Sequence, residues 1–168
     1  MCLEREAELV GASLRLLDWP GHAGPIVFVD DPFAPDFTLA ARIAEAFAPR
    51  YRVLHIALRP DAPYQVHVED VHGVLQQFGF ARPVLVASGL GAVIVVLLAA
   101  WYPSLVGALV LLDPVYEPPR DERLPACALR ECPPDWSAIR RRLRCRELLL
   151  EGAAPDLLDR LGAFLGAA

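Results

Sequence analysis

The apolar residues of this chain follow two patterns, which occur in turn along the sequence. Short apolar runs rich in β-branched residues predict buried strands, and longer runs with apolar positions three or four apart predict helices. The predicted strands are residues 25–29, 52–58, 84–87, 106–112 and 147–150. The predicted helices are residues 37–47, 66–78, 92–102, 136–143 and 156–165. Residues 1–7 are expected to form a frayed start, and residues 8–18 a strand or a hairpin.

This order predicts an α/β fold with a single domain over residues 1–168. Strand and helix alternate, which is typical of a three-layer sandwich. We therefore expect a mostly parallel central sheet of about six strands, with helices on both faces. Residues 115–135 have many prolines and charges and little periodicity, so a shortened lid or loop is expected there.

The centre of the fold is predicted to lie in residues 83–114. Val84-Leu85-Val86-Ala87 predicts a buried strand, and the small residues Ser88-Gly89-Leu90-Gly91 follow it. Residues 92–102 are apolar almost all round, which indicates a helix buried against a sheet. A second apolar strand ends at Asp113. The segment is therefore expected to form a strand–helix–strand unit at the middle of a parallel sheet.

Composition excludes several classes of function. Hydrophobic residues make up 55% of the chain and charged residues 22%, as in a globular domain. The net charge of -5 and the lack of a long basic stretch argue against a nucleic-acid partner. All 16 basic residues are arginine, which excludes a lysine Schiff base. The four cysteines lack the spacing of a zinc site, so we expect no metal and no cofactor.

The first ten residues also bear on localisation. They are charged and contain no apolar core segment, so no signal peptide is expected. The longest apolar run, residues 89–102, is shorter than the about 20 residues that span a bilayer. We therefore expect a cytoplasmic protein with no membrane partner.

The segment around Ser88 resembles the nucleophile elbow of the α/β-hydrolases, which reads small-x-Ser-x-Gly between a strand and a helix. The pattern fits with Ala87 as the leading small residue and Gly91 as the last glycine, so that Gly89 stands at the nucleophile position. Centring the motif on Ser88 is the alternative, although Val86 and Leu90 would then stand where small residues are needed.

The resemblance also implies that other catalytic parts of the family are altered. Asp30-Asp31 stands where the family has His-Gly, and Pro32, which has no N–H, stands where an oxyanion-hole donor is expected. Pro155 stands at the position of the acid. The family's histidine follows the last strand, and no histidine follows His72 here. Together these differences argue against Ser-His-Asp hydrolysis.

The family's sheet order would bring several polar residues to one edge. Asp30, Asp31 and Asp113 would lie at neighbouring strand ends and could act as general acids or bases, or merely as caps of loops and helices. With no bulky side chain at Gly89, an apolar pocket is expected beside it, and its lining candidates, which could instead be core residues, are Phe33, Leu90, Tyr116 and Trp136. Ser88 could orient a ligand by a hydrogen bond, or merely fill the turn as a small residue.

Three functions remain open at this point. The first is a non-hydrolytic enzyme, of the cyclase, isomerase or lyase type, acting on an apolar small molecule through strand-end carboxylates. The second is a catalytically inactive pseudoenzyme that binds a ligand or a partner. The third is a divergent hydrolase that uses Ser88. An exposed sheet edge would also favour a homodimer.

Overall fold

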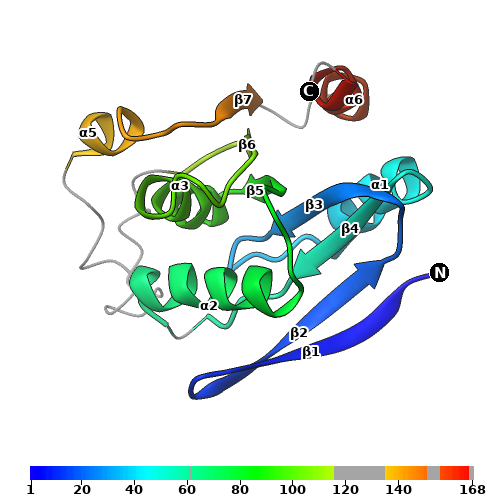
Figure 1. Ribbon diagram of the computed structural model, residues 1–168, viewed down its shortest axis with the longest axis horizontal. Helices are drawn as coiled ribbons and strands as arrows, with labels where there is room; N and C mark the ends of the chain where they lie inside the picture. The colour runs from blue at the N-terminus through cyan, green and yellow to red at the C-terminus, as the bar shows by residue number, and fades with distance from the viewer. Residues whose placement is uncertain (61, 116–134, 151–155, 167–168) are drawn as a thin grey trace.

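The computed structural model describes residues 1–60, 62–115, 135–150 and 156–166 (Figure 1). Its strands are β1 (Leu3–Leu9), β2 (Ala12–Trp19), β3 (Ala23–Val29), β4 (Tyr51–Ile56), β5 (Val84–Ser88), β6 (Ala108–Leu112) and β7 (Arg146–Leu150). Its helices are α1 (Phe37–Phe47), α2 (Tyr64–Gln77), α3 (Gly91–Trp101), α5 (Trp136–Arg140) and α6 (Leu157–Gly166).

The strands form one seven-stranded sheet in the order β1-β2-β4-β3-β5-β6-β7. Strands β3 to β7 all run parallel to one another, whereas β1 and β2 form an antiparallel hairpin and β2 pairs antiparallel with β4. The predicted α/β class and the mostly parallel sheet are therefore confirmed. The prediction of a frayed start over residues 1–7 was wrong, because residues 3–9 form the edge strand β1.

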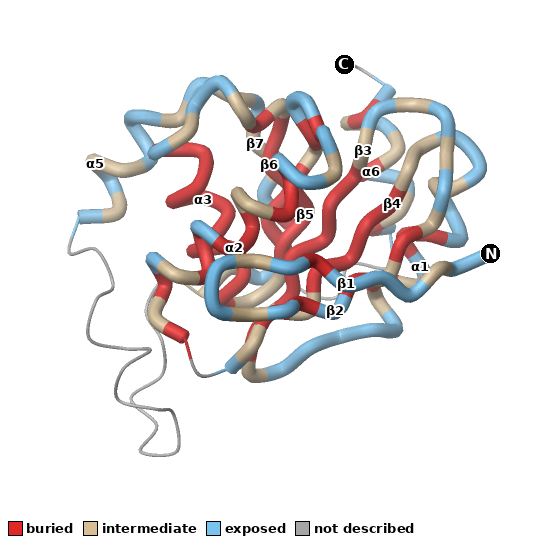
Figure 2. Tube along the Cα trace, turned by 60° about the horizontal axis from the view of Figure 1, so that its bottom comes forward, coloured by how far each residue is buried: buried red, intermediate tan, exposed pale blue. Residues whose placement is uncertain are grey.

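The two faces of the sheet are covered by different helices (Figures 1 and 2). Successive residues of a strand point to opposite faces, so each central strand contributes to two cores. Val27 and Val29 of β3 join the core beneath α2 and α3, whereas Ile26 and Phe28 join the core beneath α1 and α6. Ten of the eleven residues of α3 are buried, which explains why this helix is apolar all round.

Local signals explain where the other helices begin and how they lie. The Asp36 carboxylate accepts a hydrogen bond from Leu39 N–H and caps α1, and Asp135 caps α5 in the same way through Ala138 N–H. The buried residues of α1 are Ala40, Ile43 and Ala44, whereas Phe37 in its first turn is half exposed. No helix of the described residues is both long and apolar enough to cross a membrane.

Candidate active site at the ends of the parallel strands

The turn between β5 and α3 has the backbone shape that the elbow motif predicts. Gly89 has a φ of 51°, in the left-handed region that favours glycine. Its N–H donates to Leu112 O at 3.2 Å, and its carbonyl accepts from Val115 N–H at 3.1 Å. These bonds fix the turn against the end of β6. The structure thus places Gly89, and not Ser88, at the sharp bend.

The end of β3 lies directly against this turn. A Cβ atom added at Gly91 would come within 2.6 Å of Val29 O and of Asp30 O. Since real Cβ atoms do not approach backbone oxygens so closely, only glycine allows α3 to begin this near to β3. The close approach brings the aspartates that follow β3 next to Gly89 and Leu90.

The Asp31 side chain fills the space in front of Gly89. Its Oδ2 accepts a hydrogen bond from Leu90 N–H at 2.9 Å, and its Oδ1 accepts from Phe33 N–H at 2.9 Å. A Cβ atom built on Gly89 would overlap Asp31 Oδ2 and lie 3.3 Å from Asp31 Cγ. A negative charge here also lies at the N-terminal end of α3, where the helix dipole favours it. The elbow therefore holds a carboxylate that comes from the loop after β3.

Asp30 is buried and binds several parts of the site together. Its Oδ1 accepts from Asp31 N–H at 2.9 Å and from the Ser88 hydroxyl at 3.1 Å. Its Oδ2 accepts from Asp36 N–H at 2.6 Å. One carboxylate thus connects the loop after β3, the end of β5 and the start of α1. Its first role is to hold Asp31 in place.

His55 is not among the site residues predicted from the sequence, but the structure connects it to Asp30. His55 lies in β4, opposite Phe28 of β3, and is fully buried. Its Nε2 lies 3.3 Å from Asp30 Oδ2, and its ring packs edge-on against Phe37. The sequence carries no signal of this contact, because it depends on the pairing of β3 with β4.

The other predicted site residues are spread more widely. Asp113 follows β6 with an exposed side chain and a φ of 43°, which is uncommon for a residue other than glycine. Phe33 is half-buried in the loop after β3. Trp136 begins α5 and packs against the core beneath α3. Tyr116 and the predicted acid position Pro155 lie outside the described residues.

Two further features of the site are the hydrogen bond of Ser88 and the arrangement of residues that could ligate a metal. The Ser88 hydroxyl donates to Asp30 and not to an imidazole. In the ranges that the structure describes, no group of three His, Cys, Asp or Glu residues is arranged to hold a metal ion.

Comparison with known proteins gives structural neighbours only. No family model and no curated protein matches the sequence. A haloalkane dehalogenase loop variant from Bradyrhizobium elkanii superposes with a TM-score of 0.60 at 18% identity, over 67% of this chain and 40% of that one. E-2-(acetamidomethylene)succinate hydrolase gives 0.61 at 18%, over 67% and 45%. Epoxide hydrolase CorEH gives 0.62 at 16%, over 68% and 43%.

The chain therefore spans less than half the length of these enzymes. What they share with it is the architecture, because identity at this level shows the fold alone. The sheet, the helices on its two faces and the turn at Gly89 together show that this chain has the α/β-hydrolase fold.

Proposed function

We propose that this protein binds an apolar small molecule beside the turn at Gly89 and transforms it without forming an acyl-enzyme. The reaction would be an isomerisation, a cyclisation or an elimination, in which a carboxylate moves a proton. Gly89 offers no side-chain nucleophile, so a covalent intermediate at this position is not available. We assign the role of general base or acid to Asp31.

The observation that carries this proposal is the position of the Asp31 carboxylate. It lies over Gly89, and its Oδ2 takes the hydrogen bond of Leu90 N–H. In the hydrolase mechanism such an N–H would stabilise a substrate oxyanion. Here it holds and orients a carboxylate instead. Each oxygen of Asp31 accepts one hydrogen bond from a backbone N–H group and retains a further lone pair for a substrate proton.

Asp30 supports this role as a positioning residue. Its bond to Asp31 N–H and its bond to Ser88 fix the loop after β3 against β5. Since its side chain is 1% exposed, contact between Asp30 and a substrate is not expected. Asp113, with its exposed side chain at the next strand end, is the second candidate for proton transfer.

A binding module without turnover is the second candidate function. It is favoured by the fact that all four carboxylate oxygens of Asp30 and Asp31 already accept hydrogen bonds from the chain itself. Carboxylates that cap loops in this way can be purely structural. A divergent hydrolase that uses Ser88 receives less support, since the Ser88 hydroxyl is engaged by Asp30.

Two measurements separate these functions. A library of apolar ketones, alkenes and epoxides is screened for binding by ligand-observed NMR, and each bound compound is followed for conversion. We expect conversion by the wild type that Asp31→Asn abolishes while binding persists. Asp36→Asn is the matched control, because asparagine also caps helices well. In this variant both ligand binding and conversion should remain. Binding without conversion of any compound would establish the module instead.

The hydrolase alternative is tested with p-nitrophenyl acetate. We expect no release of p-nitrophenol above the rate of the Ser88→Ala variant. Ester hydrolysis that Ser88→Ala removes would contradict the proposal.

A further inference from the structure

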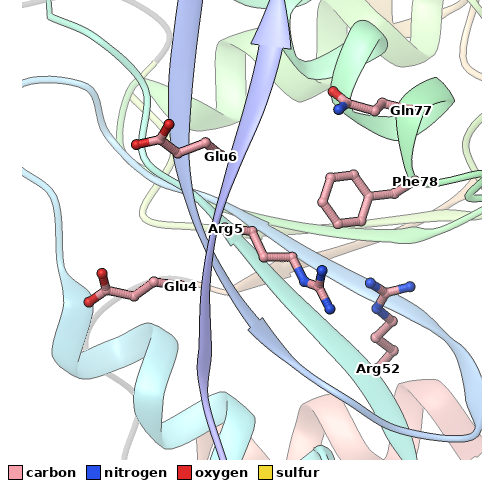
Figure 3. Close-up of a pocket in the computed structure, with 6 residues that line it drawn as sticks. All are labelled: Glu4, Arg5, Glu6, Arg52, Gln77 and Phe78. Atoms are coloured by element: carbon pink, nitrogen blue, oxygen red, sulfur yellow. The ribbon is translucent and has the colours of Figure 1, made fainter.

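A hollow of about 570 Å³ lies far from the carboxylate site, between β1 and the C-terminal end of α2 (Figure 3). We call it the arginine hollow, and its lining residues are Glu4, Arg5, Glu6, Arg52, Gln77 and Phe78. Arg52 is the second residue of β4, so the hollow belongs to the amino-terminal edge of the parallel strands. Asp31 follows the carboxyl end of β3, at the opposite edge.

A single buried carboxylate holds the two arginines of the hollow together. Arg52 Nε and Nη2 bind the two oxygens of Asp18 at 3.0 and 2.8 Å, and Arg5 Nε binds Asp18 Oδ2 at 2.7 Å. The Asp18 side chain is 1% exposed, whereas those of Arg5 and Arg52 are 46% and 30% exposed. Both cations therefore remain open to solvent while their shared anion does not.

The charges at this place do not balance. Burial by itself would raise the pKa of Asp18, but the hydrogen bonds and charges of Arg52 and Arg5 outweigh it and lower that pKa. Asp18 is thus ionised at neutral pH and compensates one guanidinium of the two. Glu4 and Glu6 do not compensate the other, because side chains alternate along β1. Figure 3 shows their carboxylates on the other side of the strand from the guanidinium groups.

The geometry also leaves hydrogen-bond donors available on both arginines and holds the Arg52 guanidinium in place. Within the described part of the chain, Arg5 donates hydrogen bonds through its Nε only, and Arg52 donates through Nε and Nη2. The Arg52 guanidinium packs 5.3 Å from the centre of the Phe78 ring and 5.0 Å from that of Phe80. These contacts fix its orientation, so little side-chain entropy would be lost on binding.

We propose that the arginine hollow is a binding site for a small organic carboxylate with an apolar body. The terminal nitrogens of Arg5 and Arg52 bind the carboxylate, as guanidinium groups commonly do. The half-buried ring of Phe78 contacts the apolar body, and the exposed Gln77 lies at the rim. This site is independent of the function proposed for Asp31.

The proposal is tested by titrating the full chain with sodium benzoate. Binding is measured by calorimetry and by NMR of the arginine Nε–H groups. We expect saturable binding with shifts of the Arg5 and Arg52 signals. Arg5→Gln should weaken binding by about tenfold or more. This variant leaves the bonds between Arg52 and Asp18 in place, so the fold should persist. Arg15→Gln is the matched control, because Arg15 pairs across the hairpin with Glu6 on the other face.

Two further ligands make the outcome decisive. Benzamide, which has the same ring but no charge, should not bind, and acetate should bind more weakly than benzoate. Phe78→Leu should reduce the preference for benzoate over acetate. Absence of saturable binding, equal weakening by Arg15→Gln, or equal affinity for benzamide would overturn the proposal and leave the arginines as partners of Asp18 only.

Discussion

Asp31 Oδ2 and Leu90 N lie 2.9 Å apart and are joined by a hydrogen bond. Leu90 follows the residue at the bend of the elbow, and its N–H is the donor that a hydrolase of this fold would offer to an oxyanion. The donor is therefore taken by the protein's own carboxylate. The bond joins the loop after β3 to the start of α3, and under the function proposed above it orients the carboxylate that moves the proton.

Placing a serine at the bend is expected to cost stability for two separate reasons. In Gly89→Ser the side chain would both adopt a positive φ and overlap Asp31 Oδ2. We expect a loss of unfolding free energy of about 2–4 kcal/mol, measured by urea denaturation. Gly79→Ser is the control, since Gly79 has a φ of 64° and nothing within 4 Å of an added Cβ. It should lose only about 1 kcal/mol.

The double variant Asp31→Gly/Gly89→Ser separates these two causes. Removal of the Asp31 carboxylate takes away the overlap, so the double variant should be more stable than the sum of the two single changes predicts. Strict additivity would show that Asp31 does not occupy the space in front of Gly89.

Gly91 should tolerate no larger residue. Gly91→Ala puts a methyl group within 2.6 Å of two backbone oxygens, and backbone at the end of a central strand cannot easily move. We expect a loss of about 2–4 kcal/mol in urea denaturation. In Gly162→Ala, within α6, the nearest atom to the new methyl is 3.7 Å away. The unfolding free energy of that control should rise by up to about 1 kcal/mol, because alanine favours a helix more than glycine does. Similar losses of stability in both variants would contradict the close approach of β3 and α3.

Asp30 is expected to matter more for stability than its neighbour Asp36. Asp30→Asn replaces one accepting oxygen by an NH₂ group in a buried place where backbone N–H groups and a hydroxyl already donate. The resulting conflict between donors should cost about 1–3 kcal/mol, measured by urea denaturation. Asp36→Asn, at an exposed helix cap, should change stability by less than about 0.5 kcal/mol. An equally small effect at Asp30 would show that its bonds contribute little.

The buried His67 side chain should make the free energy of unfolding depend on pH. Burial, aided by the positive charge of Arg59, lowers the pKa of His67 to about 4. The unfolded chain, with a histidine pKa near 6.5, therefore takes up a proton before the folded chain does. The contribution of His67 is fully present above about pH 6.5 and is lost as pH falls towards 4, by roughly 3 kcal/mol in all.

Urea denaturation between pH 7.5 and 4 measures this dependence. His67→Gln should flatten the fall in stability over that window, whereas His22→Gln, which changes an exposed side chain, should keep it. A wild-type slope that survives in His67→Gln would assign the pH dependence to another group.

Most elements of the fold could be predicted from local pattern. The strands that became β3 to β7 and the helices α1, α2, α3 and α6 follow from apolar periodicity, because buried faces repeat with the geometry of each element. Strand β1 could not be predicted in this way. Four of its seven residues are charged or polar and exposed, since an edge strand has little surface to bury, and its pairing with β2 decides its structure.

The sequence by itself determined that Gly89 occupies a turn between a buried strand and a buried helix, and that two aspartates follow an earlier strand. Only the tertiary structure decided what those aspartates do. The pairing of β3 with both β4 and β5 sets Asp30 against His55 and Ser88, and Gly91 lets the backbone approach closely enough for Asp31 to reach Leu90. These contacts join residues up to 59 positions apart, and such distances are defined only once the sheet has formed.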